Sequence, residues 1–409
     1  MATATPSAIP DPHGPAKPKP GGHHERGQPR PELGPVDLPQ GKIVARRWKV
    51  VDKLGEGGCG AVYLVEDQKT KQRAALKAES NFVPGGSVLK LEVQVLRRLS
   101  GRQYVAQLIT SGKKEKYSYM VMTLFGPSLS RLFKYCKREF TISTQVRLGM
   151  QMLYGLKQLH EVGYVHRDLK PANLAVGVRG KASRVVHLLD FGLSREYIIK
   201  NEKGRPEMRR PRENTLFRGT TKYCSSNSHK RAEQGRPDDL WSMVYVLAEM
   251  RGPLPWDQIR DKHEIGRIKK STSDDKLLAK CPYQMKEIAN HLRELTYFNR
   301  PDYQLIYTIF EDIMHEHKIK FSDPLDWEIL GYGPNAVPPA IAMDFDKMKP
   351  GKMRKKISRI QSVAEDPSVH KTSATTTTTT SKAGTESKDA SEEGSPFNRN
   401  EFDKNEMGF

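Results

Sequence analysis

The sequence is poor in cysteine and has no long hydrophobic run. Its four cysteines are scattered and no two stand in a CxxC pair, so neither a disulfide framework nor a structural zinc site is indicated. The most apolar segment, 241–250, is too short to span a bilayer, and the first residues lack the apolar core of a signal peptide. These absences predict a soluble, intracellular protein without a transmembrane segment, cytoplasmic and with the nucleus as a second location.

Large apolar residues are nearly missing from both ends of the chain. Residues 1–41 are rich in proline, glycine, histidine and charge, whereas 350–409 are first basic and then rich in serine and threonine. Segments of this kind cannot bury enough apolar surface to offset the conformational entropy lost on folding. We therefore expect a disordered leader over 1–41, a disordered tail over 350–409, and one folded domain over 48–330.

Acidic residues are too few to balance the basic ones. The 68 lysines and arginines exceed the 48 acidic residues and give a formal charge of +20, which favours anionic partners. Nucleic acid is one such partner, but neither a zinc-ligand spacing nor a ribonucleoprotein motif accompanies the charge, so we expect no specific nucleic acid. The basic cluster at 347–359 fits a nuclear signal, a polyanion-binding arm or a solvated tail.

Apolar periodicity divides the folded region into a strand-rich first part and a mainly helical second part. Alternating apolar residues surround a glycine cluster in the first part, and helical spacing dominates from residue 144 onward. This order predicts an α+β protein. Strands are expected at 48–54, 61–66, 73–78 and 117–124, and helices at 88–99, 144–161, 241–250 and 285–295.

A glycine-rich loop at 55–60 joins the first two predicted strands. With Val62 it matches G-x-G-x-x-G-x-V, in which missing side chains let backbone N–H groups approach phosphates. A strand follows the third glycine, whereas a dinucleotide-binding fold would place a helix there. Lys77 ends the third strand and Glu92 lies mid-helix, where the two can pair beside the phosphates. The alternative is a surface lysine and a solvated glutamate.

Residues 166–173, His-Arg-Asp-Leu-Lys-Pro-Ala-Asn, carry the strongest chemical signal in the chain. Asp168 can accept the proton of a substrate hydroxyl, Lys170 can stabilise the migrating phosphoryl charge, and Asn173 can hold a Mg²⁺ ion. Asp190 begins Asp-Phe-Gly at the end of an apolar strand, where its carboxylate can bind Mg²⁺ that bridges the nucleotide phosphates. Together these residues predict phosphoryl transfer from ATP to a hydroxyl.

On these motifs, residues 48–327 resemble the protein kinase family. The resemblance implies a two-lobed α+β fold, with a small strand-rich N-lobe that carries one regulatory helix and a larger, mainly helical C-lobe. Lys170 is typical of the serine/threonine branch, so the implied reaction transfers the γ-phosphoryl group of ATP, with Mg²⁺, to serine or threonine of protein substrates. Asp239 resembles the buried aspartate that holds the catalytic loop. The implied ATP-binding residues are Leu54, Gly55, Gly57, Gly60, Val62, Lys77, Glu92, Met122, Thr123 and Phe125.

The end of the activation segment narrows the resemblance. The usual Ala-Pro-Glu is absent, and Ser-Ser-Asn at 225–227 with His229 stands there, as in the casein kinase 1 group. Other segments, such as 88–92 and 300–306, most resemble the tau-tubulin kinases of that group. The resemblance implies a monomer that favours acidic or pre-phosphorylated sites, with tubulin or microtubule-associated proteins as candidate partners.

Basic residues crowd the segment between Asp190 and Asn227, which borders the peptide groove in a kinase. A solvated face is the alternative reading, but arginine and lysine also suit phosphate and carboxylate groups. Arg218 and Lys222 are the best candidates for an anion subsite.

Two other classes of function use the same fold. A pseudokinase would present a surface without catalysis and would be indicated by degraded motif residues, yet Lys77, Asp168, Asn173 and Asp190 are all intact. A cytoskeletal adaptor would bind the acidic tails of tubulin through its basic surface. Because that role is compatible with catalysis, it stays open.

Overall fold

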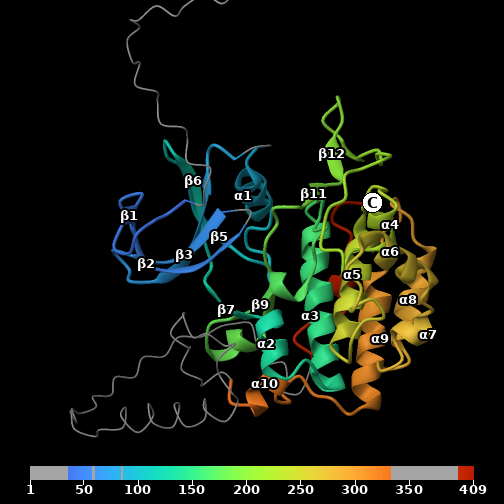
Figure 1. Ribbon diagram of the computed structural model, residues 1–409. Helices are drawn as coiled ribbons and strands as arrows, with labels where there is room; N and C mark the ends of the chain where they lie inside the picture. Colours follow the sequence, from blue (N-terminus) through green and yellow to red (C-terminus); the bar gives the residue numbers. More distant parts are fainter. Residues whose placement is uncertain (1–35, 58–59, 84–85, 333–394) are drawn as a thin grey trace, which may run out of the picture. The chain divides into compact units, whose positions relative to one another are not determined.

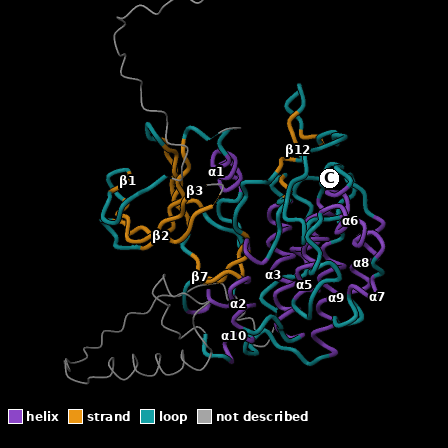
Figure 2. Tube along the Cα trace, viewed as in Figure 1, coloured by secondary structure: helices purple, strands orange, loops and turns teal. Residues whose placement is uncertain are grey.

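Figure 1 shows the computed structural model, which describes residues 36–57, 60–83, 86–332 and 395–409. Strands dominate the first lobe of the described chain and helices the second, as Figure 2 shows by colour. The expected two-lobed α+β fold is confirmed. Among the described residues, no helix is both long enough and apolar enough to cross a membrane.

The N-lobe is built on one antiparallel sheet of six strands in the order β1-β2-β3-β4-β6-β5. Strands β1 and β5 are additions to the sequence-based prediction. The first has two residues, and none in β5 is fully buried, so neither shows a marked apolar alternation. The strands are β1 Ile43–Val44, β2 Trp48–Gly57, β3 Gly60–Asp67, β4 Arg73–Ser80, β5 Leu108–Lys113 and β6 Tyr117–Met122.

One helix, α1 (Val88–Arg98), accompanies this sheet. It begins where the hydroxyl of Ser87 accepts a hydrogen bond from the backbone N–H of Lys90 at 3.1 Å, which satisfies one of the free donors of the first turn. Its buried residues include Leu89 and Glu92. The amphipathic spacing therefore sets a carboxylate on the same face as the apolar side chains.

The N-lobe begins earlier than the sequence pattern predicts. Leu38 is 2% exposed, its backbone N–H donates to the Tyr63 hydroxyl at 3.1 Å, and that hydroxyl donates to the carbonyl of Val36 at 2.6 Å. The expectation of a disordered leader over 1–41 is therefore wrong for residues 36–41, because one leucine and one buried tyrosine hydroxyl hold them. Residues 1–35 lie outside the described part of the chain.

The C-lobe is organised around α3 (Ile142–His160), whose residues are mostly buried. It packs against α5 (Arg236–Glu249) and α9 (Tyr303–Glu316). A side chain at Gly149 of α3 would meet the Phe310 ring of α9 at 2.8 Å, so glycine allows the close approach of these two helices. The predicted helices at 144–161, 241–250 and 285–295 correspond to α3, α5 and α8 (Met285–Glu294), with ends that differ by at most five residues.

Shorter elements connect these helices and carry the motif residues. The strands β7 Phe125–Ser128, β9 Leu174–Gly177 and β10 Val186–Leu188 form one small sheet, and β8 Tyr164–Val165 pairs with β11 Arg195–Glu196, as β12 Ile198–Lys200 does with β13 Pro206–Met208. The remaining helices are α2 Leu129–Tyr135, α4 Ser226–His229, α6 Lys262–Ser271, α7 Asp274–Leu277, α8 Met285–Glu294, α10 Asp326–Ile329 and α12 Asn400–Asp403, with the 3-10 turns η1 Pro171–Asn173 and η2 Gly180–Arg184.

Residues 395–409 pack on the C-lobe and contain α12. Phe402 is fully buried and Phe397 is 9% exposed. The expectation of disorder over all of 350–409 is therefore wrong for residues 395–409, because two aromatic side chains supply apolar surface that the average composition of the tail conceals. Residues 333–394, with the basic cluster at 347–359, lie outside the described residues.

Candidate active site

The glycine loop leaves β2 and enters β3 where Gly57 pairs with Gly60 and Gly55 pairs with Val62. Gly60 has a φ of +109°, and a Cβ there would lie 2.2 Å from the carbonyl oxygen of Ala78. A Cβ at Gly55 or Gly57 would meet nothing within 4 Å. The third glycine therefore serves the strand packing, whereas the first two leave space beside the loop.

Alanine at Gly60 should destabilise the protein by about 1–3 kcal/mol, because it combines a left-handed backbone with a contact against a strand carbonyl. Alanine at Gly57 should leave stability within about 0.5 kcal/mol but raise KM for ATP. Thermal unfolding and ATP titration of both variants check this. Equal melting temperatures for the two variants would contradict the role assigned to Gly60.

Lys77 and Glu92 form a buried ion pair between β4 and α1. The Lys77 Nζ lies 2.6 Å from Glu92 Oε2 and 3.4 Å from Asp190 Oδ1. Burial raises the pKa of Glu92, although Lys77 opposes that rise. For Asp190, burial alone would raise the pKa, but the charges of Lys77 and His166 outweigh it and hold the value below the usual range. One ammonium group thus joins the two lobes.

Asp190 takes a backbone conformation that suits a functional role. Its φ is +61°, in the left-handed region that non-glycine residues rarely adopt. Its side chain is 41% exposed, whereas the neighbouring Phe191 is fully buried and packs beside the His166 ring at 5.5 Å. The buried phenylalanine therefore anchors the tripeptide while the carboxylate stays accessible.

The carboxylate of Asp168 is surrounded by donors. Its Oδ2 accepts from the Lys170 ammonium at 2.6 Å, and its Oδ1 accepts from the backbone N–H and the hydroxyl of Thr220 at 2.8 and 2.7 Å. Asn173 donates its amide to the Asp168 carbonyl at 2.9 Å, which fixes the side chain that carries the candidate metal-binding oxygen. Sequence reasoning missed Thr220, which comes close only because the activation segment folds back.

Asp239 holds the backbone of the catalytic loop through hydrogen bonds. Its carboxylate accepts the backbone N–H groups of His166 and Arg167 at 2.7 and 2.8 Å and lies 2.9 Å from His160 Nε2. Burial alone would raise the pKa of Asp239, but the hydrogen bonds from His160 and the loop outweigh it and lower the value. His160 in turn contacts the Tyr303 hydroxyl at 2.7 Å. Sequence reasoning missed both partners, because His160 belongs to no motif and the 300–306 segment suggested no contact for Tyr303.

The nucleotide-side candidates come from the junction of the two lobes. Leu54 lies on β2, Met122 ends β6, and Phe125 begins β7. The backbone N–H of Thr123 donates to the Gln107 carbonyl at 3.0 Å, which ties this connection to the segment before β5. These residues flank the glycine loop and Lys77 in the strand order, because β4 pairs with both β3 and β6.

The two candidates for the anion subsite differ in their surroundings. Lys222 is held by two carboxylates, Glu249 at 2.6 Å and Asp257 at 2.8 Å, so its charge is already neutralised. The structure thus argues against Lys222 as an anion ligand. Arg218 is exposed, and its side chain has no hydrogen bond or ion pair with the described residues. Of the two candidates, Arg218 is therefore the one whose charge has no partner among the described residues.

Further arginines surround the position of Arg218. Glu233 is shared by Arg212 at 2.6 Å and Arg195 at 3.2 Å. Burial and then the charges of neighbouring arginines, Arg218 among them, lower the pKa of Arg167 to about 10. Two arginines therefore share one carboxylate, with Arg167 and Arg218 nearby, which leaves an excess of positive charge on this side of the activation segment.

Lys269 of α6 supports the segment that follows Thr220. It is 6% exposed, and its ammonium donates to the carbonyls of Thr221 at 2.8 Å and Cys224 at 2.6 Å. It also faces the rings of Tyr245 and Trp256 at 4.9 and 5.0 Å. Burial lowers its pKa to about 8.

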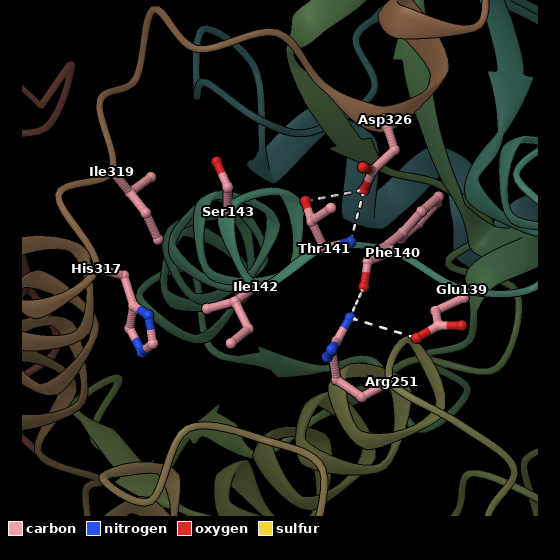
Figure 3. A pocket seen from close by; sticks show the side chains of 9 residues that line it. All are labelled: Glu139, Phe140, Thr141, Ile142, Ser143, Arg251, His317, Ile319 and Asp326. Carbon is pink, nitrogen blue, oxygen red and sulfur yellow. Dashed lines mark hydrogen bonds and ion pairs between the residues drawn. The ribbon is translucent and has the colours of Figure 1, made fainter.

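A separate pocket of about 490 Å³ lies at the start of α3, away from the motif residues (Figure 3). Asp326 accepts the backbone N–H of Thr141 at 2.8 Å, and Arg251 hydrogen-bonds the Phe140 carbonyl. These polar contacts hold the beginning of α3 in place. The polar side chains that line the pocket therefore have a structural role.

The comparisons with known proteins agree with this geometry. The model of the protein kinase domain matches residues 48–314. A Caenorhabditis elegans protein whose name places it among the serine/threonine-protein kinases is 50% identical over 299 residues, which cover 73% of this chain and 86% of that protein. The serine/threonine-protein kinase spe-6 of the same organism is 33% identical over 291 residues, 69% of this chain and 76% of the relative.

A Dictyostelium discoideum protein that also bears the name of a serine/threonine-protein kinase is 38% identical over 296 residues, 72% of this chain. The match spans 59% of that relative's length. The chain belongs to the protein kinase family. Within the family it is a serine/threonine-protein kinase, a transferase that acts on proteins, and the family in general uses ATP and Mg²⁺.

Proposed function

We propose that this kinase transfers the γ-phosphoryl group of ATP to serine or threonine in acidic or pre-phosphorylated sites, and that it belongs to the casein kinase 1 group, tau-tubulin branch. The observation that carries the catalytic part is the Lys77–Glu92 pair at 2.6 Å, beside Asp190 and above a catalytic loop with Asp168 and Asn173 intact. The charged and polar groups that phosphoryl transfer needs come from both lobes and are present at the lobe junction.

The residues present fit ATP with Mg²⁺. Gly55 and Gly57 leave open space where phosphates approach backbone N–H groups. Lys77 presents a cation there, and the accessible Asp190 carboxylate with the Asn173 side-chain oxygen supplies hard oxygen ligands of the kind Mg²⁺ prefers. When bound, Mg-ATP supplies the transferable phosphoryl group. Leu54, Val62, Met122 and Phe125 would enclose the adenine.

The protein's own part in catalysis is positioning and charge. Asp168 orients the substrate hydroxyl and accepts its proton, and Lys170, fixed 2.6 Å from that carboxylate, stabilises negative charge next to it. The Thr220 hydroxyl occupies one oxygen of Asp168 at 2.7 Å, so it marks the place where a hydroxyl donor fits. The side chains form no covalent intermediate in this scheme.

The excess of arginine around Glu233 supports a preference for anionic substrates. Arg218 is exposed and unpaired among the described residues, whereas Arg195 and Arg212 already share Glu233. A guanidinium group binds phosphate or carboxylate through two parallel hydrogen bonds. We assign Arg218 to the anion subsite and Lys222 to holding the segment next to it.

The substrate preference is tested with paired peptides that differ only in a phosphoserine, glutamate or alanine near the target serine. Arg218→Ala should lower kcat/KM about tenfold for the phosphorylated and acidic peptides, which corresponds to one strong hydrogen-bonded charge pair. Turnover of the alanine peptide should stay unchanged. Lys203→Ala, at an exposed lysine of the same basic segment, is the control. Equal losses on all three peptides would contradict an anion subsite.

The proposed partners and cellular location follow from the resemblance to the tau-tubulin kinases. The net charge of +20 supports binding to acidic protein surfaces, with tubulin or microtubule-associated proteins as substrates of a monomeric, cytoplasmic and also nuclear enzyme. Salt-sensitive cosedimentation of an Asp168→Asn variant with microtubules tests the binding separately from catalysis. Failure to phosphorylate any serine or threonine peptide in a library would overturn the enzyme itself.

A further inference from the structure

Residues 395–409, the docked segment, lie on a face of the C-lobe made by α3, α9 and the loop around Tyr104. The ring of Phe402 stacks on Tyr307 of α9 with 4.2 Å between centroids and meets Tyr154 of α3 edge-on at 5.5 Å. Phe397 lies beside Tyr104 at 5.1 Å. Two aromatic anchors spaced five residues apart thus fill a site lined by aromatic side chains.

Polar contacts fix the direction of the docked segment on this face. Arg300 donates to the Lys404 carbonyl at 2.6 Å at the end of α12, where helix carbonyls lack partners. Arg102 binds the Glu406 carboxylate through both guanidinium nitrogens, one of them at 2.6 Å. The backbone N–H of Glu406 donates to Glu161 at 2.6 Å. These bonds involve the backbone as well as side chains, as in peptide recognition.

The last residues of the docked segment contact residues next to the catalytic loop and in the activation segment. Met407 and Phe409 pack against a small cluster of Val165, Tyr197 and Ile198. Arg236 at the start of α5 donates to the Phe409 carbonyl at 2.7 Å and lies over the Tyr197 ring at 4.9 Å. This cluster is separate from the main core of the C-lobe.

The small cluster connects directly to residues used in the reaction. Val165 precedes His166 and pairs with Arg195 in the β8–β11 ladder. Ile198 begins β12 in the activation segment. Arg236 stands three positions before Asp239, which holds the catalytic loop. Docking therefore buries apolar side chains next to the β8–β11 pair, which joins the catalytic loop to the activation segment.

We propose that this face of the C-lobe is a peptide-binding site, that its occupant is the chain's own docked segment, and that docking positions the catalytic loop and the activation segment for transfer. The ligand class is an aromatic and acidic peptide that presents the anchors Phe397 and Phe402 and the carboxylate of Glu406. Docking is a step separate from the folding of the kinase domain. The effect on activity rests on the proposed function, whereas the binding site does not.

The test uses the full chain with Phe402→Ala, which removes one anchor, and Asp403→Ala as the control, because Asp403 is an exposed neighbour on the same helix. A fluorescent peptide of residues 395–409 should bind the Phe402→Ala protein at least tenfold more tightly than it binds the wild type, whose site is occupied. Fluorescence anisotropy measures this without any activity. Equal affinity for both proteins would overturn the binding site.

The second readout is turnover of a peptide substrate. Phe402→Ala should lower kcat at least fivefold with KM for ATP unchanged, and saturating docked-segment peptide should restore kcat, whereas the same peptide with Phe402→Ala should not. Glu406→Ala, which removes the carboxylate that Arg102 binds and leaves the site on the C-lobe intact, should behave in the same way if Phe402→Ala folds poorly. Peptide binding without any change in kcat would overturn the positioning role. A wild type that labels no substrate would instead contradict the proposed function.

Discussion

Asparagine at Asp168 is expected to lower kcat for any peptide substrate by a factor of about 10³ to 10⁴, because an amide cannot accept the substrate proton. The surrounding donors, Lys170 and Thr220, should keep the side chain in place, since the amide oxygen can still accept one of their hydrogen bonds. Nucleotide affinity should change less than about twofold, because Asp168 does not hold the phosphates. Steady-state kinetics and calorimetric ATP binding together measure the two effects.

The matched control is Asp312→Asn, an exposed aspartate on α9. It should retain full activity. If Asp168→Asn kept more than a tenth of the wild-type kcat while binding ATP normally, Asp168 would not be the proton acceptor. If it lost ATP binding as well, the loss of activity would instead report a disturbed nucleotide site.

Alanine at Asp239 should lower the free energy of unfolding by about 3–5 kcal/mol, the usual loss when one member of a buried charged network is removed. The backbone N–H groups of His166 and Arg167 would lose their acceptor at 2.7 and 2.8 Å, and His160 would lose its carboxylate partner. Urea unfolding of the wild type and the variant measures the difference. Asp312→Ala is the control and should change stability by less than about 0.5 kcal/mol.

The direction in which stability changes with pH follows from His160, the partner of Asp239. Burial lowers the pKa of His160 below its usual 6.5, so between these two values the unfolded chain binds a proton that the folded chain does not. Stability must therefore fall as the pH drops through 6.5.

For the Asp239→Ala variant, a loss of unfolding free energy below about 1 kcal/mol would show that the catalytic loop is held by other contacts.

The sequence was sufficient for the fold class and for the residues that stand in motifs. The α+β prediction rested on strand alternation before residue 124 and on helical spacing after residue 144, and both patterns reflect which faces are buried. Lys77 and Glu92 could be paired on paper because a strand and then a helix carry them in the family order. In the structure the two side chains do form an ion pair, with 2.6 Å between Lys77 Nζ and Glu92 Oε2.

What the sequence could not provide are contacts between residues far apart in the chain, whether or not they stand in a motif. His160 meets Tyr303 across 143 positions, and Thr220 meets Asp168 across 52, so no local pattern brings these pairs together. The burial of Phe402 was hidden for a different reason. An average over residues 350–409, most of them polar, concealed the phenylalanines near the end of this range, although two aromatic anchors are enough to dock a short segment.

The buried Lys269 affects how the enzyme's response to alkali should be interpreted. Its ammonium, with a pKa of about 8, holds the backbone carbonyls of Thr221 and Cys224. A change in activity near pH 8 is therefore expected to coincide with proton loss from a support of the segment that follows Thr220. On the alkaline side, an activity profile of this kinase is therefore expected to include the loss of this support as well as proton transfer in the reaction.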